Sequence, residues 1–304
     1  MKSIVYHNIK NFDKKCKYDK FLSIKNFNKQ IIFLKKNFKF FDCYNLFHKN
    51  FLVKKNNIFL TFDDGLKNHY DNVYPILKKN NLNAIFYIPY NPIINKKILD
   101  VHKIHMVLGK YPSKSVDAYL NKIVENKMLQ SSKRFRSAYL NFSGDLLATK
   151  IKKKLNYEIK HEYKNYVINK LFNFFYKDIN EKIIVKKYYL SMKDIKIMSK
   201  NNMIIGSHST SHPVLSNVPE KSFMIEIKTG VDYFSHFNQN YYKTFSYPFG
   251  IKNSYNTKII NYLNNLKVNF SMIVSNKDIS NNVFHNNPQE LPRYDCKDLY
   301  KFKV

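Results

Sequence analysis

Short apolar runs alternate with segments of helical periodicity along much of this chain. The apolar runs lie at residues 57–62, 84–89, 203–207, 244–247 and 270–274. Segments with one apolar helical face lie at residues 27–38, 73–80, 191–201, 220–237 and 255–266. Strands that are apolar on both faces are typical of parallel sheets covered by helices. The alternation therefore predicts an α/β fold, either a parallel β/α barrel or an open doubly wound sheet.

Residues 91–187 interrupt this alternation. They are rich in Lys and mostly helical in period, for example at 118–129 and 166–176. Such a segment is too long for a simple connection between a strand and a helix. We therefore expect an inserted helical subdomain at 91–187, with residues 1–90 and 188–304 forming the main barrel domain.

The charge of the chain is strongly positive. It carries 52 Lys and Arg against 22 Asp and Glu, which gives a formal net charge of +30. The Lys residues are spread along the whole sequence, whereas a nucleic-acid footprint usually gathers on one face. We therefore expect no nucleic-acid partner, and only a general attraction to anionic polymers or lipid surfaces.

The sequence favours a cytoplasmic protein. No stretch reaches the ~20 apolar residues that a membrane span needs. The first residues have the pattern of a buried strand rather than of a signal peptide. Cys16, Cys43 and Cys296 are far apart and form no CxxC pair, so a disulfide scaffold is not expected. Peripheral attachment to a membrane is an alternative, and the oligomeric state stays open.

Polar residues directly follow three of the predicted strands. These patches are TFDDG at 61–65, GSHSTSHP at 206–213 and FSYPFG at 245–250. In parallel α/β folds the carboxyl ends of the strands meet at one mouth, where active sites lie. We therefore expect the three patches to lie close together.

Two histidines and two carboxylates in these patches suggest a metal site. His208 and His212 would share one face of a helical turn, so both imidazoles could reach one ion. Asp63 and Asp64 follow an apolar run, and leaving two buried carboxylates unpaired would be costly. A cation would neutralise one of them and leave the other as a base. The alternatives are hydrogen-bonded loop histidines and a solvated Asp-Gly turn.

The same patches resemble the motifs of the polysaccharide deacetylases, also called the NodB-homology or carbohydrate esterase family 4 enzymes. The similarity lies in Thr61-Phe62-Asp63-Asp64-Gly65, His208-Ser209-Thr210-Ser211-His212 and Tyr247-Pro248-Phe249-Gly250, and extends to Tyr6-His7-Asn8 and Leu291-Pro292-Arg293. It covers residues 1–90 and 188–295. The resemblance implies a distorted (β/α) barrel with one strand fewer than a TIM barrel.

Carried over residue by residue, the resemblance implies that Asp63 is the general base. It implies that Asp64, His208 and His212 hold a divalent metal ion. Zinc is the expected ion, and cobalt, nickel and iron also suit this ligand set. Such an ion polarises an amide carbonyl and lowers the pKa of water, while the base takes a proton as water attacks.

Three further residues are expected to contact the substrate, and the resemblance assigns a role to the first of them. The backbone N–H of Phe249 would help to stabilise the oxyanion. Tyr247 and His102 are expected to bind the substrate, an N-acetylated carbohydrate.

This sequence departs from the family pattern at two places. The third motif of the family often begins with Arg, where this chain has Ser246. We expect Arg293 to take over the tuning of the base, and the alternative is a structural salt bridge. Family members often carry the general acid in a later Leu-x-x-x-His motif, which is not found near the end of this chain. The expected replacement is His105, and the alternatives are His102, His7 and His285.

The sequence thus predicts a metal-dependent hydrolase that removes an N-acetyl group from a sugar of a surface polysaccharide or its precursor. One alternative is an O-acetyl esterase, which would depend less on a general acid. Another is a catalytically impaired, glycan-binding homologue. The helical insertion is expected to cover the barrel mouth and to set substrate choice.

Overall fold

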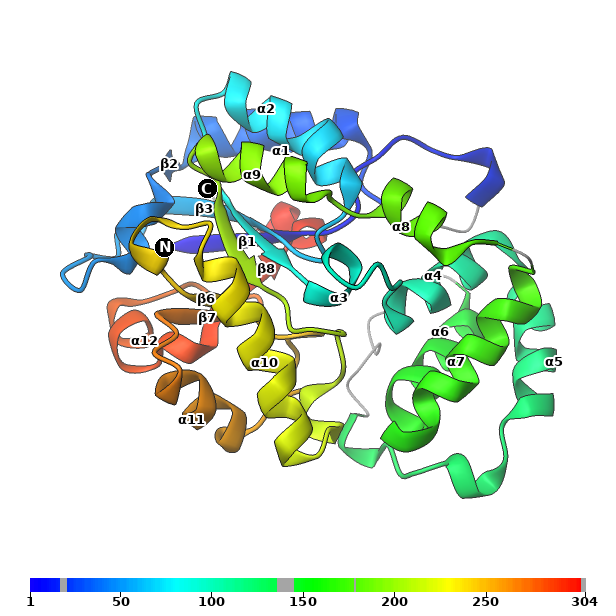
Figure 1. Ribbon diagram of the computed structural model, residues 1–304. Coiled ribbons are helices and arrows are strands. Elements are labelled where there is room, and N and C mark those ends of the chain that lie inside the picture. Colours follow the sequence, from blue (N-terminus) through cyan, green and yellow to red (C-terminus); the bar gives the residue numbers. More distant parts are fainter. Residues whose placement is uncertain (17–20, 136–144, 178, 302–304) are drawn as a thin grey trace.

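The computed structural model describes residues 1–16, 21–135, 145–177 and 179–301. Its centre is a barrel of parallel strands with helices packed around it (Figure 1). The strands are β1 (Lys2–Tyr6), β2 (Lys39–Phe40), β3 (Asn57–Phe62), β4 (Ile85–Ile88), β5 (Ile204–Ser207), β6 (Thr244–Ser246), β7 (Phe270–Val274) and β8 (Leu291–Asp295).

The strands close into a ring. Their order is β1-β8-β7-β6-β5-β4-β3, and β1 also pairs with β3. The additional strand β2 pairs with the beginning of β3, where Lys39 lies opposite Asn57. The pairings between these strands are parallel. The described residues therefore form a seven-stranded barrel with one extra strand, which confirms the distorted (β/α) barrel and excludes the open doubly wound sheet.

Helices cover the outside of this barrel. They are α1 (Ile24–Asn37), α2 (Tyr74–Lys79), α9 (Met192–Lys200), α10 (Glu220–Ser235), α11 (Thr257–Asn265) and α12 (Asn281–Asn286). Local signals define where they begin. At the start of α9, the Ser191 side chain accepts from the Asp194 N–H and the Asp194 carboxylate accepts from the Ser191 N–H. This reciprocal cap explains why the helix predicted from residue 191 forms there.

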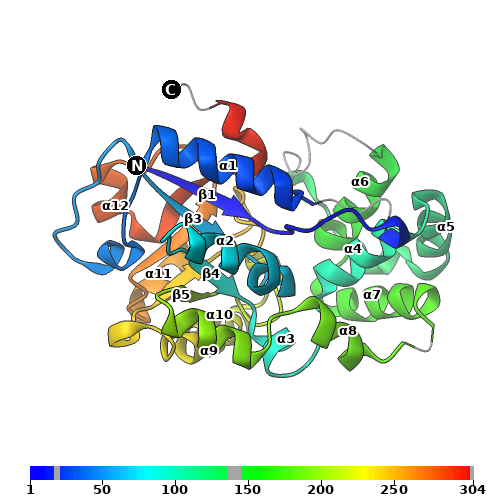
Figure 2. The same cartoon turned by 90° about the horizontal axis from the view of Figure 1, so that it is seen from above.

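The segment between β4 and β5 is helical, as expected. It contains α3 (Tyr90–Ile93), α4 (Asp100–Lys110), α5 (Ser113–Ile123), α6 (Leu146–Lys153), α7 (His161–Phe175) and α8 (Glu181–Tyr188). Helices α4 to α8 lie together on one side of the barrel (Figures 1 and 2). The helix predicted at 118–129 is wrong in its bounds, because α5 ends at Ile123 and Leu129 forms an antiparallel bridge with Ile159.

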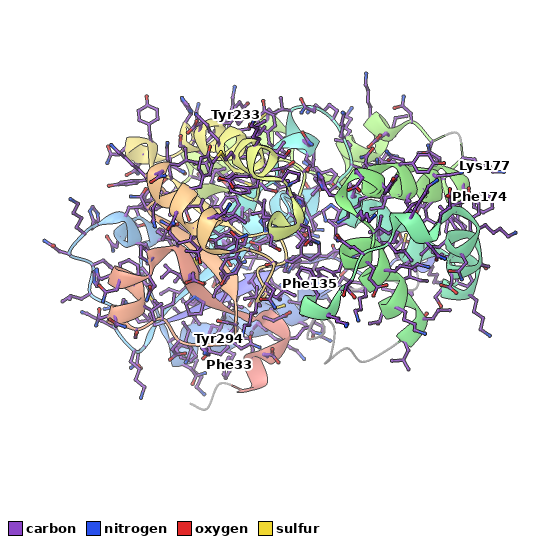
Figure 3. All side chains as sticks on the ribbon, turned by 90° about the horizontal axis from the view of Figure 1, so that it is seen from below. Phe33, Phe135, Phe174, Lys177, Tyr233 and Tyr294 are labelled. Atoms are coloured by element: carbon purple, nitrogen blue, oxygen red, sulfur yellow. The ribbon has the colours of Figure 1, made fainter. Side chains whose placement is uncertain are left out.

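The insertion and the barrel share one apolar core. Leu171 of α7 and Phe62 of β3 belong to the same continuous cluster of buried side chains. Phe135 lies near the junction of the two parts (Figure 3), where it stacks on Tyr157, whose ring in turn contacts Phe249. The division into 1–90, 91–187 and 188–304 remains a prediction about domains.

Single helical turns complete the structure. They are η1 (Lys14–Cys16), η2 (Cys43–Phe47), η3 (His69–Val73), η4 (Asn126–Met128), η5 (Lys133–Phe135), η6 (Lys154–Glu158), η7 (Leu215–Asn217), η8 (Gln239–Tyr241), η9 (Pro288–Glu290) and η10 (Cys296–Lys301). Within the described ranges, none of the helices combines the length and the apolar character that crossing a bilayer requires.

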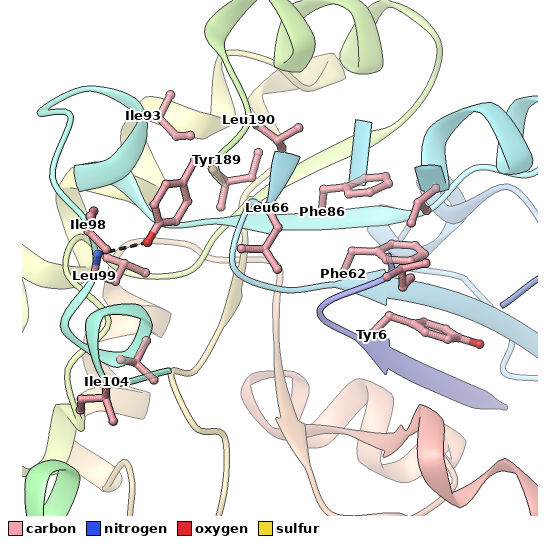
Figure 4. Close-up of a cluster of buried hydrophobic side chains, with 14 of the residues drawn as sticks. Tyr6, Phe62, Leu66, Phe86, Ile93, Ile98, Leu99, Ile104, Tyr189 and Leu190 are labelled. Carbon is pink, nitrogen blue, oxygen red and sulfur yellow. Dashed lines mark hydrogen bonds between the residues drawn. The ribbon is translucent and has the colours of Figure 1, made fainter. Parts of the chain in front are cut away.

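The side chains of β3 alternate between two environments, as in any strand. Phe62 faces outward and stacks between Tyr6 and Phe86, in the apolar layer beneath the helices (Figure 4). Thr61 faces into the barrel, where its hydroxyl accepts from Arg293. Asp63 is next in the inward series. The pleat of β3 therefore directs the Asp63 carboxylate into the mouth of the barrel.

Candidate metal centre and active site

Two strand ends bring the predicted metal ligands together. Asp64 follows β3 and His208 follows β5, while His212 lies four residues farther along the same loop. One ligand atom from each of these three buried residues lies within 4.8 Å of the other two. The expected meeting of the distant patches at one mouth is therefore observed.

The ligand atoms fit a divalent metal ion. His208 Nε2 and His212 Nε2 each lie 3.6 Å from Asp64 Oδ1. Asp64 Oδ1 is buried and has no hydrogen-bond partner among the described residues. A buried carboxylate oxygen without a partner is costly unless a cation binds it. Two imidazole nitrogens and one carboxylate oxygen are also a common protein ligand set for such an ion.

A backbone hydrogen bond fixes the form of His208. Its Nδ1 lies 2.8 Å from the carbonyl oxygen of Ser246, which can only accept. The proton must therefore sit on Nδ1, and the Nε2 lone pair is left for a ligand. Burial lowers the pKa of His208. Burial, and to a smaller extent the charge of His208, lowers the pKa of His212 to about 3. Both rings are thus neutral near pH 7, as metal ligands must be.

His208 and His212 do not lie on a helical turn, which corrects the sequence prediction. Residues 208–212 form a loop in which Ser209 and His212 have φ of 63° and 61°. The Ser209 hydroxyl accepts from the His212 N–H at 3.0 Å. Asp64 and Phe249 also have left-handed backbone, with φ of 77° and 65°. Such strain in non-glycine residues is uncommon and tends to gather at functional sites.

Glu226 of α10 holds this loop in place. Its carboxylate accepts from the N–H of Thr210 at 3.1 Å, the N–H of Ser211 at 2.7 Å and the hydroxyl of Ser211 at 2.5 Å. Burial raises the pKa of Glu226, and the bonds from Ser211 and Thr210 oppose that rise. Gly230, one turn farther along α10, allows the helix to lie close to the end of β5, because a Cβ at this position would collide with Ser207.

Arg293 holds Asp63, the first carboxylate of the DDG motif. Its Nη1 and Nη2 donate to the two oxygens of Asp63 at 2.7 and 2.8 Å, and both side chains are buried. The Ser246 hydroxyl donates to Asp63 at 3.0 Å and accepts from Arg293 at 2.8 Å. Burial raises the pKa of Asp63, but Arg293 and then His208 outweigh it and lower the value to about 2. Asp63 is therefore an ionised carboxylate beside the candidate metal ligands.

A polar cleft leads to these residues from the side of the insertion. It has a volume of about 600 Å³ and is lined by His212 and Ser211 from the barrel. On the opposite side it is lined by Lys103 of α4 and by Asn165 and Asn169 of α7. A cleft of this size with many amide and charged groups suits a ligand that carries many hydroxyl groups.

Comparison with known sequences decides the family. The profile of the polysaccharide deacetylase family matches residues 52–99 and 166–271, just over half of the chain. The chain belongs to the polysaccharide deacetylase family. The matched ranges contain the DDG motif, both histidines and Phe249. A sequence search of curated proteins finds no match.

Solved structures of deacetylases share the fold. A Streptococcus pyogenes deacetylase, PplD, has a TM-score of 0.57 at 15% identity, covering 97% of this chain and 91% of that one. IcaB from Ammonifex degensii has a TM-score of 0.55 at 12% identity, covering 96% and 90%. A de-N-acetylase from Aggregatibacter actinomycetemcomitans has a TM-score of 0.52 at 11% identity, covering 96% and 93%.

Two expected substrate contacts of the deacetylase are not supported. Tyr247 is only 1% exposed, and its hydroxyl donates to the carbonyl of Gln289 within the core. Because Ser246 faces into the barrel, the next residue must face away from the mouth. His102 is 2% exposed and its ring contacts Asp64 and Tyr189, so it lies behind the ligand set.

The candidates for the general acid lie at different places. His105 is half-buried on α4, and burial followed by the charges of Lys152 and His102 lowers its pKa well below 6.5. His7 is exposed and directly follows β1, in which Tyr6 lies opposite Phe62, so His7 is next to Asp63 in register. His285 lies on α12. Asn281 at the start of α12 accepts a hydrogen bond from the N–H of Val53, which precedes β3. His285 is therefore at the opposite end of the barrel.

Phe249 lies beside one of the candidate metal ligands. Its ring contacts that of His212, with centroids 5.0 Å apart. Among the described residues, no acceptor binds its backbone N–H. Sequence reasoning missed Glu226 and Tyr189, because neither belongs to a motif. Each contacts a residue that is distant in sequence, Ser211 for Glu226 and His102 for Tyr189.

Proposed function

We propose that this polysaccharide deacetylase family member is metal-dependent and removes an N-linked acetyl group from a sugar of a surface polysaccharide or its precursor. The observation that carries the proposal is the buried group of Asp64, His208 and His212 beside the ionised Asp63. A scaffold or a glycan-binding protein has no need of a buried ligand set with an adjacent base. The structural relatives include a de-N-acetylase, which supports the same chemistry.

Asp64, His208 and His212 would hold the ion, with zinc expected and cobalt, nickel or iron as alternatives. When bound, such an ion polarises the acetyl carbonyl and lowers the pKa of water. Asp63 accepts the proton of the attacking water, and the Arg293 fork keeps its carboxylate ionised and oriented. The free N–H of Phe249 donates to the oxygen that becomes negative as the carbonyl carbon turns tetrahedral.

We assign the role of general acid to His7 rather than to His105. An acid must carry a proton before the amine leaves, and the lowered pKa of His105 works against this. His7 is exposed at the barrel mouth, one strand away from Asp63. His7→Ala should lose about 100-fold or more in amide hydrolysis, but little in hydrolysis of an activated ester, whose leaving group needs no proton. Equal losses for both substrates would return the role to His105.

Acetate release tests the proposed function. The metal-loaded protein should release acetate from N-acetylated oligosaccharides faster than from O-acetylated ones, and Asp63→Asn should bind metal normally but lose turnover. Preference for the O-acetylated set would establish the esterase alternative. Absence of acetate with zinc, cobalt, nickel and iron, together with retained sugar binding, would establish the glycan-binding alternative.

A further inference from the structure

The two oxygens of the Asp64 carboxylate have different neighbours. Oδ1 faces His208 and His212. Oδ2 lies 3.3 Å from Nε2 of His102, which comes from α4 in the helical insertion. The side chain of Asp64 is therefore held between the barrel and the insertion. Burial raises its pKa, but His102 and the other nearby histidines outweigh burial and lower it well below 3.8.

Tyr189 determines which ring nitrogen of His102 carries the proton. The Tyr189 hydroxyl accepts from the N–H of Leu99 at 3.1 Å and lies 2.5 Å from His102 Nδ1. Tyr189 is 1% exposed, and within the described structure its hydroxyl proton has no other acceptor. The proton must therefore point at Nδ1, which leaves the His102 proton on Nε2, facing Asp64.

The chain around Tyr189 is tied to the turn that carries Asp64. Tyr189 forms an antiparallel bridge with Leu66, and the N–H of Leu190 donates to the carbonyl of Gly65 at 2.9 Å. Figure 4 shows the Tyr189 ring between Leu66 and Leu99, with its hydrogen bond to Leu99 drawn. Tyr189 follows α8 and Leu99 precedes α4, so the two ends of the insertion meet at this point.

We propose that His102 is a positioning residue that orients Asp64 for metal binding, and that Tyr189 acts on the metal site only through His102. The inference rests on the proposed metal site. It makes the insertion part of the metal centre as well as a wall of the cleft. Partners behind a metal ligand fix its orientation and basicity, and their removal typically costs about 10- to 100-fold in metal affinity.

Zinc titration of metal-free protein tests the proposal. His102→Leu fills the buried position with an apolar side chain and removes the Nε2–H donor. It should weaken zinc binding by about 10- to 100-fold. His102→Gln offers an amide N–H in place of Nε2–H, and its affinity should stay within about threefold of wild type. The matched control is Tyr6→Phe, because the buried Tyr6 hydroxyl has no partner among the described residues. This control should bind zinc like the wild type.

The order of action is tested by combining variants. Tyr189→Phe should weaken zinc binding by about tenfold in the wild-type background but should have no further effect in the His102→Gln background. An equal effect in both backgrounds would overturn the relay. Unchanged affinity in His102→Leu would overturn the positioning role, even if the wild type binds zinc tightly. A wild type that binds no zinc would instead refute the proposed function. Thermal unfolding of the metal-free variants shows that they are folded, and Tyr189→Phe keeps the test available should His102→Leu fail to fold.

Discussion

Arg293 grips Asp63 through two parallel hydrogen bonds of 2.7 and 2.8 Å in the closed interior of the barrel. The two residues stand 230 positions apart. Arg293 lies on β8 and Asp63 directly follows β3, and these two strands flank β1. Both residues are buried, so each charge depends on the other for compensation. The serine at position 246 is small enough to leave room for the guanidinium and adds its own hydroxyl to the pair.

Arg293→Lys should lower kcat by about 100-fold with little change in KM, because Arg293 orients the base and does not contact the substrate. The pKa of Asp63 should rise, since a single ammonium cannot replace both bonds of the fork. As the pH falls, Asp63 would then become protonated at a higher pH than in the wild type. The acid limb of the pH profile of kcat should therefore shift to higher pH. A kcat and an acid limb like those of the wild type would show that Arg293 is only structural.

Glu226→Ala should destabilise the protein by about 2 kcal/mol or more, because it removes the acceptor of three hydrogen bonds in the loop that carries the histidines. The affinity for zinc should fall as well, since His212 lies at the end of that loop. Chemical unfolding and zinc titration measure the two effects.

Glu220→Ala on the same helix is the control for this change. Its exposed pair with Lys258 should contribute less than about 1 kcal/mol. The role given to Glu226 would be wrong if the two variants lost equal stability and both bound zinc like the wild type.

His69 should make the protein less stable in mild acid. The ring is fully buried, and its Nε2 donates to the carbonyl of His7, while Nδ1 has no partner among the described residues. Burial lowers the pKa of His69 from 6.5 to about 4, so the unfolded chain binds the extra proton first. Stability from this group is complete above pH 6.5 and should decline by about 3 kcal/mol as the pH falls toward 4.

Urea unfolding of His69→Gln between pH 4 and pH 7 measures this contribution. The variant should show a shallower loss of stability in acid than the wild type, because Gln can donate to the His7 carbonyl without titrating. His48→Gln, at an exposed position, should follow the wild type. Parallel curves for the wild type and His69→Gln would exclude His69 as the acid-sensitive group.

Much of the barrel could be predicted because buried parallel strands appear in a sequence as short, mostly apolar runs. The runs at 57–62 and 270–274 match β3 and β7 at both ends, since each is mostly apolar and is followed by a polar residue. The site residues could be found for the same reason, because strand ends in such a fold share one mouth. The role of Arg293 as tuner of the base remains a prediction, now supported by its contact with Asp63.

Two of the sequence predictions failed because they depend on contacts that local spacing does not encode, whereas the one for Tyr247 could have been corrected from the sequence. The spacing of His208 and His212 suggested a helical turn, but Glu226 holds these residues in a loop from 14 positions beyond His212. Tyr247 could have been excluded from the mouth by the two-residue period of its strand, given that Ser246 faces inward. The contact between Asp64 and His102 depends on how the insertion docks, which no motif reveals.

The most direct measurement is the zinc content of the purified protein after metal loading and exhaustive dialysis, compared with His208→Ala and Asp64→Ala. The account predicts one zinc ion per wild-type chain, and loss of that ion in both variants with the fold retained by circular dichroism. A wild type that holds no ion, or variants that keep it with unchanged affinity, would contradict the account.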